Sequence, residues 1–317
     1  MEREVKELTK KVAVLYGGMS TEREVSLRTG DAIADALTLK GYNVVKIDVK
    51  RDVALKLSDA KPDVAFIGLH GKYGEDGTIQ GLLEIMHIPY TGPGVLASAL
   101  AINKKVSKKI FASQDITTAP FIAFDYTQWH KNKAAIILEV EKLGFPLVVK
   151  AALQGSSIGI YFVKSSDELL QAITEALELD KNVVIEKFIS GIEVTVAILG
   201  NSDPQILPVI EIVSHTGAYD YHSKYTAGAS SHIIPARISP LAEKRVQEEA
   251  LKTYLALDCK GLSRVDAIID SNDIPYILEV NTSPGMTATS LFPDAAKAAG
   301  IDFPELCEKI VNLALEQ

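Results

Sequence analysis

The spacing of hydrophobic and polar positions predicts alternating strands and helices over the first part of the chain. Three apolar runs predict strands, at residues 11–18, 42–48 and 63–68. Periodic apolar positions predict one helix that ends near residue 40 and another over residues 79–86. Such alternation favours a parallel sheet covered by helices, with functional loops at the carboxyl ends of the strands.

A second region begins after the GPG sequence at residues 92–94, which marks a plausible boundary. It is predicted to contain two helices, a Lys-rich one over residues 104–113 and another over 131–143. Strands are predicted at 146–150 and 160–164, joined by the loop LQGSSIG. This combination is typical of a small α+β module.

The pattern becomes rich in strands from residue 182 onward. The predicted strands are NVVIEKFI, VTVAIL, QILPVIEI, SRVDAIID and PYILEVN, and helices are predicted at 240–257 and 303–315. A polar loop from Ser214 to Ala229 interrupts them. We therefore expect an α/β and α+β fold with three domains: an N-terminal α/β domain over 1–95, a central subdomain over 96–182 and a C-terminal subdomain over 183–317.

The segment LEVNTSPGMT, residues 278–287, ends a strand with two polar side chains on one face. Side chains in a strand alternate, so Glu279 and Asn281 point one way while Leu278 and Val280 point the other. The tripeptide SND before this strand predicts a tight hairpin with a two-residue loop at 272–273.

That hairpin pairs Asp266 with Glu279 and Arg264 with Asn281. Directly opposed carboxylates repel, and a cation between them would reward the arrangement. Carboxylate and amide oxygens suit Mg²⁺, which usually binds through one or two carboxylates together with substrate phosphates. The hairpin therefore predicts a metal–nucleotide site, with two acids on a solvated sheet face as the simpler alternative.

Composition and charge narrow the classes of partner. The chain has 47% hydrophobic and 23% charged residues, a net charge of -8 and only two cysteines, Cys259 and Cys307. Distant cysteines suit a reducing compartment, so we expect a cytoplasmic protein. No apolar run approaches the ~20 residues needed to span a bilayer, and the acidic charge argues against nucleic acid, so neither a membrane nor a nucleic-acid partner is expected.

A phosphate-binding loop is predicted after the strand that ends at Lys150. The chain has no GxxxxGK[ST] sequence, so a P-loop is not indicated. The loop contains Gly155, Ser156, Ser157 and Gly159, whose backbone N–H groups could cover a polyphosphate while Lys150 supplies charge. Lys104 is a second candidate, although a run of lysines on a helix is more often a solvated face.

Together these motifs resemble the D-alanine:D-alanine ligases, ATP-grasp enzymes of peptidoglycan synthesis. The matching sequences are GGMSTEREVSL (17–27), HGKYGEDGTIQG (70–81), GPG, QGSSIG and RVD followed by LEVNTSPGMTATS. They occur in this order and cover nearly the whole chain. One departure is that Ala151 and Ala152 follow Lys150, where the family commonly has proline and serine.

The resemblance implies that ATP lies between the central and C-terminal domains. Lys104, Lys150 and Ser157 would contact phosphates, Glu186, Lys187 and Ile189 would line the adenine hinge, and Glu193 would bind the ribose. Asp266, Glu279 and Asn281 would hold two Mg²⁺ ions, which Mn²⁺ could replace, and a monovalent cation such as K⁺ could activate the enzyme. The loop 214–229, with Lys224 and Tyr225, would form a lid. The family also suggests a homodimer.

The same resemblance implies a reaction and the residues that perform it. The first D-alanine would attack the ATP γ-phosphate to give D-alanyl phosphate, and the second would displace phosphate to give D-alanyl-D-alanine. Glu22, Ser156 and Tyr225 would form a hydrogen-bonded trio beside the first D-alanine, with His70 nearby. Arg264 and the Gly285 N–H would stabilise the oxyanion, and Ser290 and Leu291 would bind the second carboxylate.

Three other functions remain open at the level of sequence. A related ligase could use D-lactate or D-serine as its second substrate, although Tyr225 favours the dipeptide, because relatives that accept D-lactate commonly carry Phe there. A nicotinamide-dependent oxidoreductase is disfavoured, because no GxGxxG follows the first strand. A regulatory protein that binds nucleotide without turnover would bind ATP but form no product.

Overall fold

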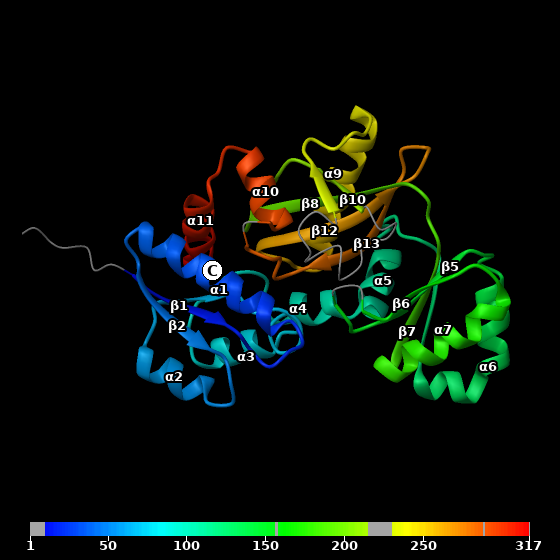
Figure 1. Cartoon of the computed structure of the whole chain (residues 1–317), viewed down its shortest axis with the longest axis horizontal. Coiled ribbons are helices and arrows are strands. Elements are labelled where there is room, and N and C mark those ends of the chain that lie inside the picture. The colour runs from blue at the N-terminus through cyan, green and yellow to red at the C-terminus, as the bar shows by residue number, and fades with distance from the viewer. Residues whose placement is uncertain (1–9, 156–157, 215–229, 288, 317) are drawn as a thin grey trace, which may run out of the picture.

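The N-terminal part of the chain folds around a small parallel sheet. The computed structural model describes residues 10–155, 158–214, 230–287 and 289–316. Its first sheet has the order β2-β1-β3, with β1 (Lys11–Tyr16), β2 (Asn43–Asp48) and β3 (Val64–Ile67). Both pairings are parallel, as the alternating pattern predicts. Around the sheet lie α1 (Arg23–Leu39), α2 (Val53–Ala60) and α3 (Thr78–Ile85) (Figure 1).

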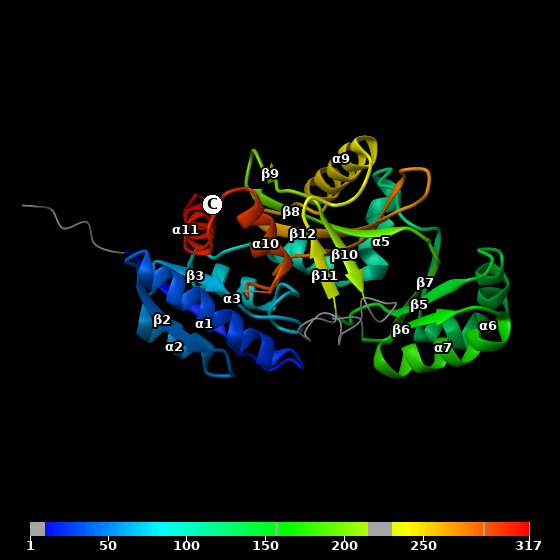
Figure 2. The same ribbon diagram turned by 45° about the horizontal axis from the view of Figure 1, so that its top comes forward.

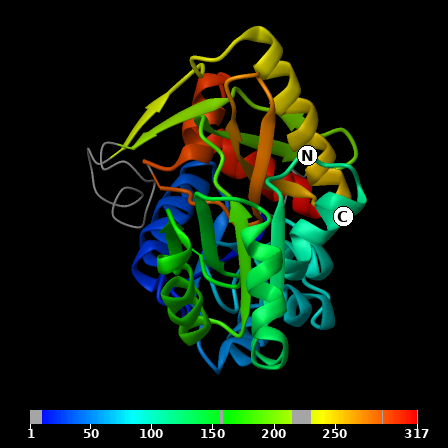
Figure 3. The same ribbon diagram turned by 90° about the vertical axis from the view of Figure 1, so that its right-hand side faces the viewer.

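The second sheet is antiparallel and has the order β4-β7-β5-β6. Its strands are β4 (Phe121–Asp125), β5 (Leu147–Ala151), β6 (Ile160–Val163) and β7 (Asn182–Lys187). The helices α6 (Tyr126–Glu141) and α7 (Ser166–Leu179) share one hydrophobic core with it, and Figure 3 shows this sheet and its helices turned toward the viewer. Lys150 and Glu186 alternate with the core residues of β5 and β7 and therefore lie on the opposite face of the sheet.

The third sheet is larger and contains the predicted acidic hairpin. Its order is β11-β10-β8-β12-β13, and β9 pairs with β8. The strands are β8 (Ile192–Gly200), β9 (Gln205–Ile206), β10 (Ile210–Ser214), β11 (Ser230–Ile233), β12 (Gly261–Ile269) and β13 (Pro275–Asn281). The centre of the sheet is long because β8 pairs with β12 over the whole of both strands.

Helices cover both faces of this sheet. One face packs against α9 (Pro240–Ala256), α4 (Val95–Ile102) and α5 (Lys104–Ser113), and the other against α10 (Leu291–Ala298) and α11 (Phe303–Leu315). Strand β8 shows why: Val196 and Ile198 enter the first core, whereas Ala197 and Leu199 enter the second. Figure 2 shows α9 and α11 on their separate sides of the sheet.

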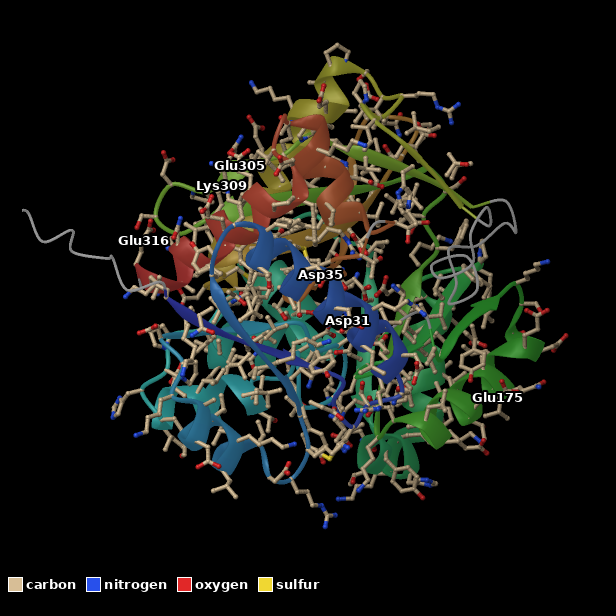
Figure 4. All side chains as sticks on the ribbon, turned by 60° about the vertical axis from the view of Figure 1, so that its left-hand side comes forward. Asp31, Asp35, Glu175, Glu305, Lys309 and Glu316 are labelled. Atoms are coloured by element: carbon tan, nitrogen blue, oxygen red, sulfur yellow. The ribbon has the colours of Figure 1, made fainter. Side chains whose placement is uncertain are left out.

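The last helix completes the N-terminal core. Leu306 and Ile310 of α11 belong to the same buried cluster as Val12, Ile33 and Phe66 of the first sheet and α1. Figure 4 labels the exposed Asp31 and Asp35 on α1 and the Glu305–Lys309 ion pair on the neighbouring α11. The first sheet, α1 and α11 thus share one buried core, although α11 lies far from the other two in the sequence.

Several elements differ from the predicted pattern. Helix α6 begins at Tyr126 rather than 131, because Asp125 and Gln128 form a capping box and the helix continues past non-helical backbone at Asn132. The run QILPVIEI divides into β9 and β10 around residues 207–209. The pattern did not indicate α2, α4, β4, α7, α10 or β11. The domain division at 95 and 182 stays a prediction.

No helix among the described residues combines the length and the apolar character needed to cross a membrane.

Candidate functional site

A cavity lies where residues from all three parts of the chain meet. Its lining includes many of the side chains that the sequence singles out: Glu22, His70, Lys104, Gly155, Arg264, Glu279, Asn281, Gly285, Ser290 and Leu291. They come from the N-terminal loops, the start of α5, the loop after β5, the acidic hairpin and the start of α10. The structure therefore gathers motifs that are far apart in the sequence into one space.

Strands β12 and β13 pair as predicted beside the cavity, but the turn that connects them differs from the prediction. Asp266 lies opposite Glu279 and Arg264 opposite Asn281, which confirms the predicted register. The predicted two-residue loop is wrong, because residues 270–274 connect the strands and the register shifts between Asp266 and Ala267. The irregularity adds one residue to β13, so Ile277 rather than Leu278 joins Val280 in the buried core.

Asp266 is held by three side chains. Arg264 binds it through two hydrogen bonds of 2.9 Å, from Nε to Oδ1 and from a terminal nitrogen to Oδ2. The Asn281 amide donates to Oδ2 at 2.9 Å, and the Thr195 hydroxyl of β8 donates to Oδ1. A bidentate arginine fixes both the position and the plane of a carboxylate, so Asp266 is a rigid feature of the site.

Glu279 pairs with a different cation. The Nζ of Lys104 lies 3.0 Å from Glu279 Oε2 and 2.9 Å from the carbonyl oxygen of Gln154 in the loop after β5. Lys104 is buried at the first position of α5, whose cap is the side chain of Asn103. The ammonium thus touches both the acidic hairpin and the predicted phosphate loop.

A buried charge cluster lies on the four-stranded sheet. Lys150 Nζ is 3.0 Å from Glu186 Oε2, and Lys108 Nζ is 3.1 Å from the same oxygen. Burial lowers the pKa of Lys108 to about 8, while the Glu186 charge acts in the opposite direction. Burial alone would raise the pKa of Glu186, but the two ammonium groups lower it overall. The cluster therefore favours an ionised Glu186.

The N-terminal loops bring Glu22 and His70 to the cavity. Glu22 precedes α1 and is buried between two backbones: a methyl group added at Gly71 would lie 3.1 Å from its Oε2, and one at Gly155 3.5 Å from its Oε1. The His70 ring is buried between Thr29 Oγ1, 3.0 Å from Nε2, and the Ser283 carbonyl, 3.2 Å from Nδ1. The motifs HGKYGEDG and NTSPG are therefore in direct contact.

The turn after β13 prepares the start of α10. The hydroxyl of Ser290, the residue before this helix, accepts a hydrogen bond from the Thr287 N–H at 3.0 Å. Gly285 approaches so closely that a methyl group there would lie 2.8 Å from Ser290 Oγ. Glycine at position 285 keeps the Ser290 hydroxyl and its own backbone N–H beside the cavity.

The remaining predicted residues are more dispersed. The Lys187 ammonium donates to the carbonyl oxygens of Gly144 and Phe145, before β5. Ile189 is half-buried after β7, and Glu193 is on β8, opposite Ile268. Among the predicted residues, Ser156, Ser157, Lys224 and Tyr225 lie outside the described residues.

Sequence reasoning missed several residues that support these groups. Lys108 was read only as part of a lysine run, yet its distance of four residues from Lys104 places both on one helical face with the buried Phe111. Phe111 continues that spacing and could have signalled a buried face. Thr29 and Thr195 carry no comparable signal, because their partners lie on separate elements.

The donor set suits a magnesium ion bound together with phosphates. Asp266, Glu279 and Asn281 supply two carboxylates and an amide, and no group of three or more His, Cys, Asp or Glu side chains able to hold a metal occurs among the described residues. The described residues therefore contain no metal site that is built from protein side chains alone. Mg²⁺ characteristically takes few protein ligands and completes its shell with phosphate oxygens and water.

Family models match most of the chain. The model described as "D-ala D-ala ligase C-terminus" matches residues 110–312, and "D-ala D-ala ligase N-terminus" matches 11–61 and 49–93. A D-alanine–D-alanine ligase of Carboxydothermus hydrogenoformans is 58% identical over 308 residues, covering 96% of this chain and 98% of that protein. One of Pelotomaculum thermopropionicum is 53% identical over 311 residues, covering 98% of each.

Solved structures extend the likeness to the fold. A D-alanine–D-alanine ligase from Bacillus anthracis complexed with ATP superimposes with a TM-score of 0.84 at 35% identity, over 97% of this chain and 98% of that one. The VanG D-Ala:D-Ser ligase from Enterococcus faecalis gives 0.82 at 34%, over 96% and 99%. With its site geometry, its family models and these relatives in agreement, the chain belongs to the D-alanine–D-alanine ligase family.

Proposed function

We propose that the protein uses ATP to join two D-alanines into D-alanyl-D-alanine, through D-alanyl phosphate and with release of ADP and phosphate, for peptidoglycan precursor synthesis. The observation that carries the proposal is the single cavity lined by Glu22, Lys104, Glu279, Gly285 and Ser290. In this cavity Glu22 supplies an acidic group for an ammonium, Lys104 a cation for phosphates and Glu279 a carboxylate of the kind that binds Mg²⁺. Gly285 and Ser290 form a turn suited to the carboxylate of the second D-alanine.

In this proposal the nucleotide would bind between the second and third sheets. Glu186, Lys187 and Ile189 would line the adenine, with Glu193 near the ribose. Lys150 and Lys104 would approach the phosphates, together with the loop that contains Ser157. Support comes from Lys104, whose ammonium already touches the Gln154 carbonyl of that loop and the Glu279 carboxylate.

Asp266, Glu279 and Asn281 are the proposed metal ligands. Bound there, two Mg²⁺ ions would neutralise the phosphate charges during phosphoryl transfer, and Mn²⁺ would substitute for them. A monovalent cation such as K⁺ is proposed as an activator. The protein's own part is to hold the two carboxylates side by side on β12 and β13, with Arg264 fixing the plane of Asp266.

The first D-alanine would place its ammonium at Glu22, beside the buried His70. Ser156 and Tyr225 are proposed to complete the hydrogen-bonded trio with Glu22, and the segment that carries Lys224 and Tyr225 is proposed to close over the substrates. Two anions, the substrate carboxylate and the terminal phosphate, must meet in the first step. Lys104, Lys150 and Arg264 would offset their repulsion, and fixed positions would supply most of the catalysis.

The second D-alanine would lie against the turn after β13. Ser290 and the start of α10 at Leu291 would bind its carboxylate, which suits the positive end of a helix. Its amine would then attack the carbonyl of D-alanyl phosphate, while the Gly285 N–H and Arg264 stabilise the oxyanion. The close approach of Gly285 to Ser290 supports this arrangement, because it places both groups on the same side of the turn.

The oligomeric state, the cellular compartment and the domain boundaries are also part of the proposal. A homodimer in the cytoplasm fits the family and the free cysteines, both of which are buried. The domain division at residues 95 and 182 fits the three sheets, although β7, the last strand of the second sheet, continues to Lys187. Light scattering of the purified protein tests the dimer directly.

The deciding experiment is phosphate release from ATP and Mg²⁺ with D-alanine, L-alanine or no amino acid, with the products identified by mass. Release that depends on D-alanine and yields the dipeptide supports the proposal. Release without D-alanine dependence from a folded sample that binds ATP would overturn the substrate assignment. D-Serine and D-lactate, each offered beside D-alanine, test the alternative raised by the likeness to a D-Ala:D-Ser ligase.

A further inference from the structure

Lys108 is a fully buried lysine that has no assigned part in the proposed reaction. It lies on α5, four residues after Lys104, and does not line the cavity described above. Its Nζ lies 3.1 Å from Glu186 Oε2 and donates a hydrogen bond of 2.6 Å to Thr118 Oγ1. An ammonium is rarely buried completely unless its position has a purpose or a close partner.

The direction of the hydrogen bonds fixes the orientation of this ammonium. The Thr118 hydroxyl donates its single proton to the Ile277 carbonyl on β13 at 2.7 Å, so it can only accept from Lys108. The backbone reinforces the contact, because the Ile277 N–H donates to the Thr117 carbonyl at 2.8 Å. Lys108 is therefore anchored to the acidic hairpin on one side while it holds Glu186 on the other.

Glu186 is held asymmetrically. Both Lys108 and Lys150 bind Oε2, whereas Oε1 is buried and has no hydrogen-bond partner among the described residues. A buried carboxylate oxygen without a donor is costly, so the arrangement suits a ligand that brings an N–H group to Oε1. Two ammonium groups on one oxygen also keep the carboxylate ionised, and an ionised carboxylate can only accept.

We propose that Lys108 is a positioning residue that holds Glu186 as an obligate hydrogen-bond acceptor and thereby makes the nucleotide site prefer a 6-amino purine to a 6-oxo purine. This inference rests on the proposed function, which places adenine beside Glu186. The 6-amino group of adenine is a donor, whereas the 6-oxo group of hypoxanthine is an acceptor that would face a carboxylate oxygen. A site built for one hydrogen-bonding partner strongly rejects the reverse pattern.

Removing the Lys108 charge should weaken that rejection. With only Lys150 beside it, the buried Glu186 carboxyl accepts a proton more readily and can then donate to a 6-oxo group. We expect Lys108→Met to lower the ratio of ATP affinity to inosine triphosphate affinity by about tenfold or more. Isothermal titration calorimetry with each nucleotide and Mg²⁺ measures this ratio without relying on turnover.

The matched control is Lys109→Met, which removes an exposed lysine from the next position of the same helix. It should leave the affinity ratio and D-alanine-dependent phosphate release unchanged. An unchanged ratio in folded Lys108→Met would overturn the inference. Equal weakening of both nucleotides would also overturn it, because that result describes a merely structural role.

A second variant keeps the test decisive if Lys108→Met does not fold. Thr118→Val removes the hydroxyl that orients Lys108 but keeps a side chain of similar shape. We expect a fall in the affinity ratio in the same direction, smaller than that of Lys108→Met, and an unchanged ratio would count against the proposal. Failure of the proposed function gives a different result from failure of this inference. The wild-type protein would then bind ATP or inosine triphosphate yet form no dipeptide.

Discussion

Lys104 Nζ lies 3.0 Å from Glu279 Oε2, so the first residue of α5 is joined directly to the last strand of the acidic hairpin. Asp266, on the opposite strand, has its own cation in Arg264. Each of the two facing carboxylates is thus balanced by a separate positive side chain. The protein itself offsets the repulsion that opposed acids would create, and both acids are kept in place beside the cavity.

Glu279→Gln should abolish most D-alanine-dependent ATP turnover while the protein stays folded. The change keeps the size of the side chain but removes the charge that would bind the metal. Removing one oxyanion-hole donor typically costs a hundredfold or more in turnover, about 2.7–4 kcal/mol, and we expect a loss of at least that order here. Turnover at increasing Mg²⁺ concentration measures the effect. The Mg²⁺ requirement should rise together with the loss.

Glu248→Gln is the control for that variant. Glu248 is an exposed carboxylate on α9, 3.8 Å from Lys244, and an exposed ion pair of this kind contributes little. Its turnover and Mg²⁺ dependence should match those of the wild-type protein. Undiminished turnover in Glu279→Gln would remove Glu279 from the set of metal ligands.

Gly285→Ala should impair use of the second D-alanine. The new methyl group would lie 2.8 Å from Ser290 Oγ and must displace either the hydroxyl or the turn. We expect the KM for D-alanine to rise by about tenfold or more, since a small misplacement of groups that orient a substrate is costly. Steady-state kinetics at saturating ATP give the value.

Gly81→Ala separates this effect from a general cost of replacing glycine. Gly81 is inside α3, and the nearest atom to an added methyl group there is 3.9 Å away. Alanine should stabilise the helix by about 0.5–1 kcal/mol and leave the kinetics unchanged. If Gly285→Ala behaves in the same way, the proposed role of this turn is wrong.

The ion pair between Arg23 and Asp48 should stabilise the N-terminal sheet in a pH-dependent way. Two hydrogen bonds from the guanidinium, of 2.7 and 2.9 Å, lower the pKa of Asp48 to about 2. Because the pKa of an unfolded Asp is ~3.9, the contribution is complete above that pH and is lost as the pH falls through the folded pKa. Asp48→Asn should therefore lower the Tm at neutral pH, and its difference from wild type should narrow with acidification.

Thermal melts of both proteins over a series of pH values check this prediction. Asp52→Asn serves as the control, since Asp52 is exposed and forms an ion pair with the partly buried Lys56 four residues away on α2. A constant Tm difference between wild type and Asp48→Asn down to acidic pH would show that the carboxylate pairing does not produce the stability.

Both thiols should be unreactive in the native protein. Burial raises the pKa of Cys259 to about 12 and also raises that of Cys307. The thiolate is the reactive form, and neither side chain is accessible, so a disulfide reagent at pH 8 should modify neither thiol until the protein unfolds. Rapid labelling of either cysteine in the folded state, followed by absorbance, would contradict the structure.

The sequence is most informative where side chains of matching chemistry follow the two-residue alternation of a strand. Asp266 and Glu279 are separated by a short turn and alternate with apolar residues, so their pairing follows from the sequence and is confirmed. With a two-residue loop and a regular ladder, Asp266 and Glu279 are partners. The observed loop is longer and β13 contains an extra residue, and these two departures compensate at the site.

Contacts between distant elements could not be predicted in this way. No local pattern relates Thr118 to Ile277 or Lys108 to Glu186, because those pairs depend on how the segment before β4 meets β13 and how α5 packs against β7. The family resemblance supplied many of the site positions, but the supporting side chains follow from tertiary packing. Residues such as Lys108 therefore emerge only from the structure.

The packing of α11 against the first sheet has a consequence for the newly made protein. Val12 and Phe66 share a core with Leu306 and Ile310, which are synthesised much later than the first sheet. Until then one side of the N-terminal sheet remains uncovered, so this region cannot complete its folding in the order of synthesis. A nascent chain stopped before residue 303 should accordingly be more sensitive to protease in its first hundred residues than one that includes α11.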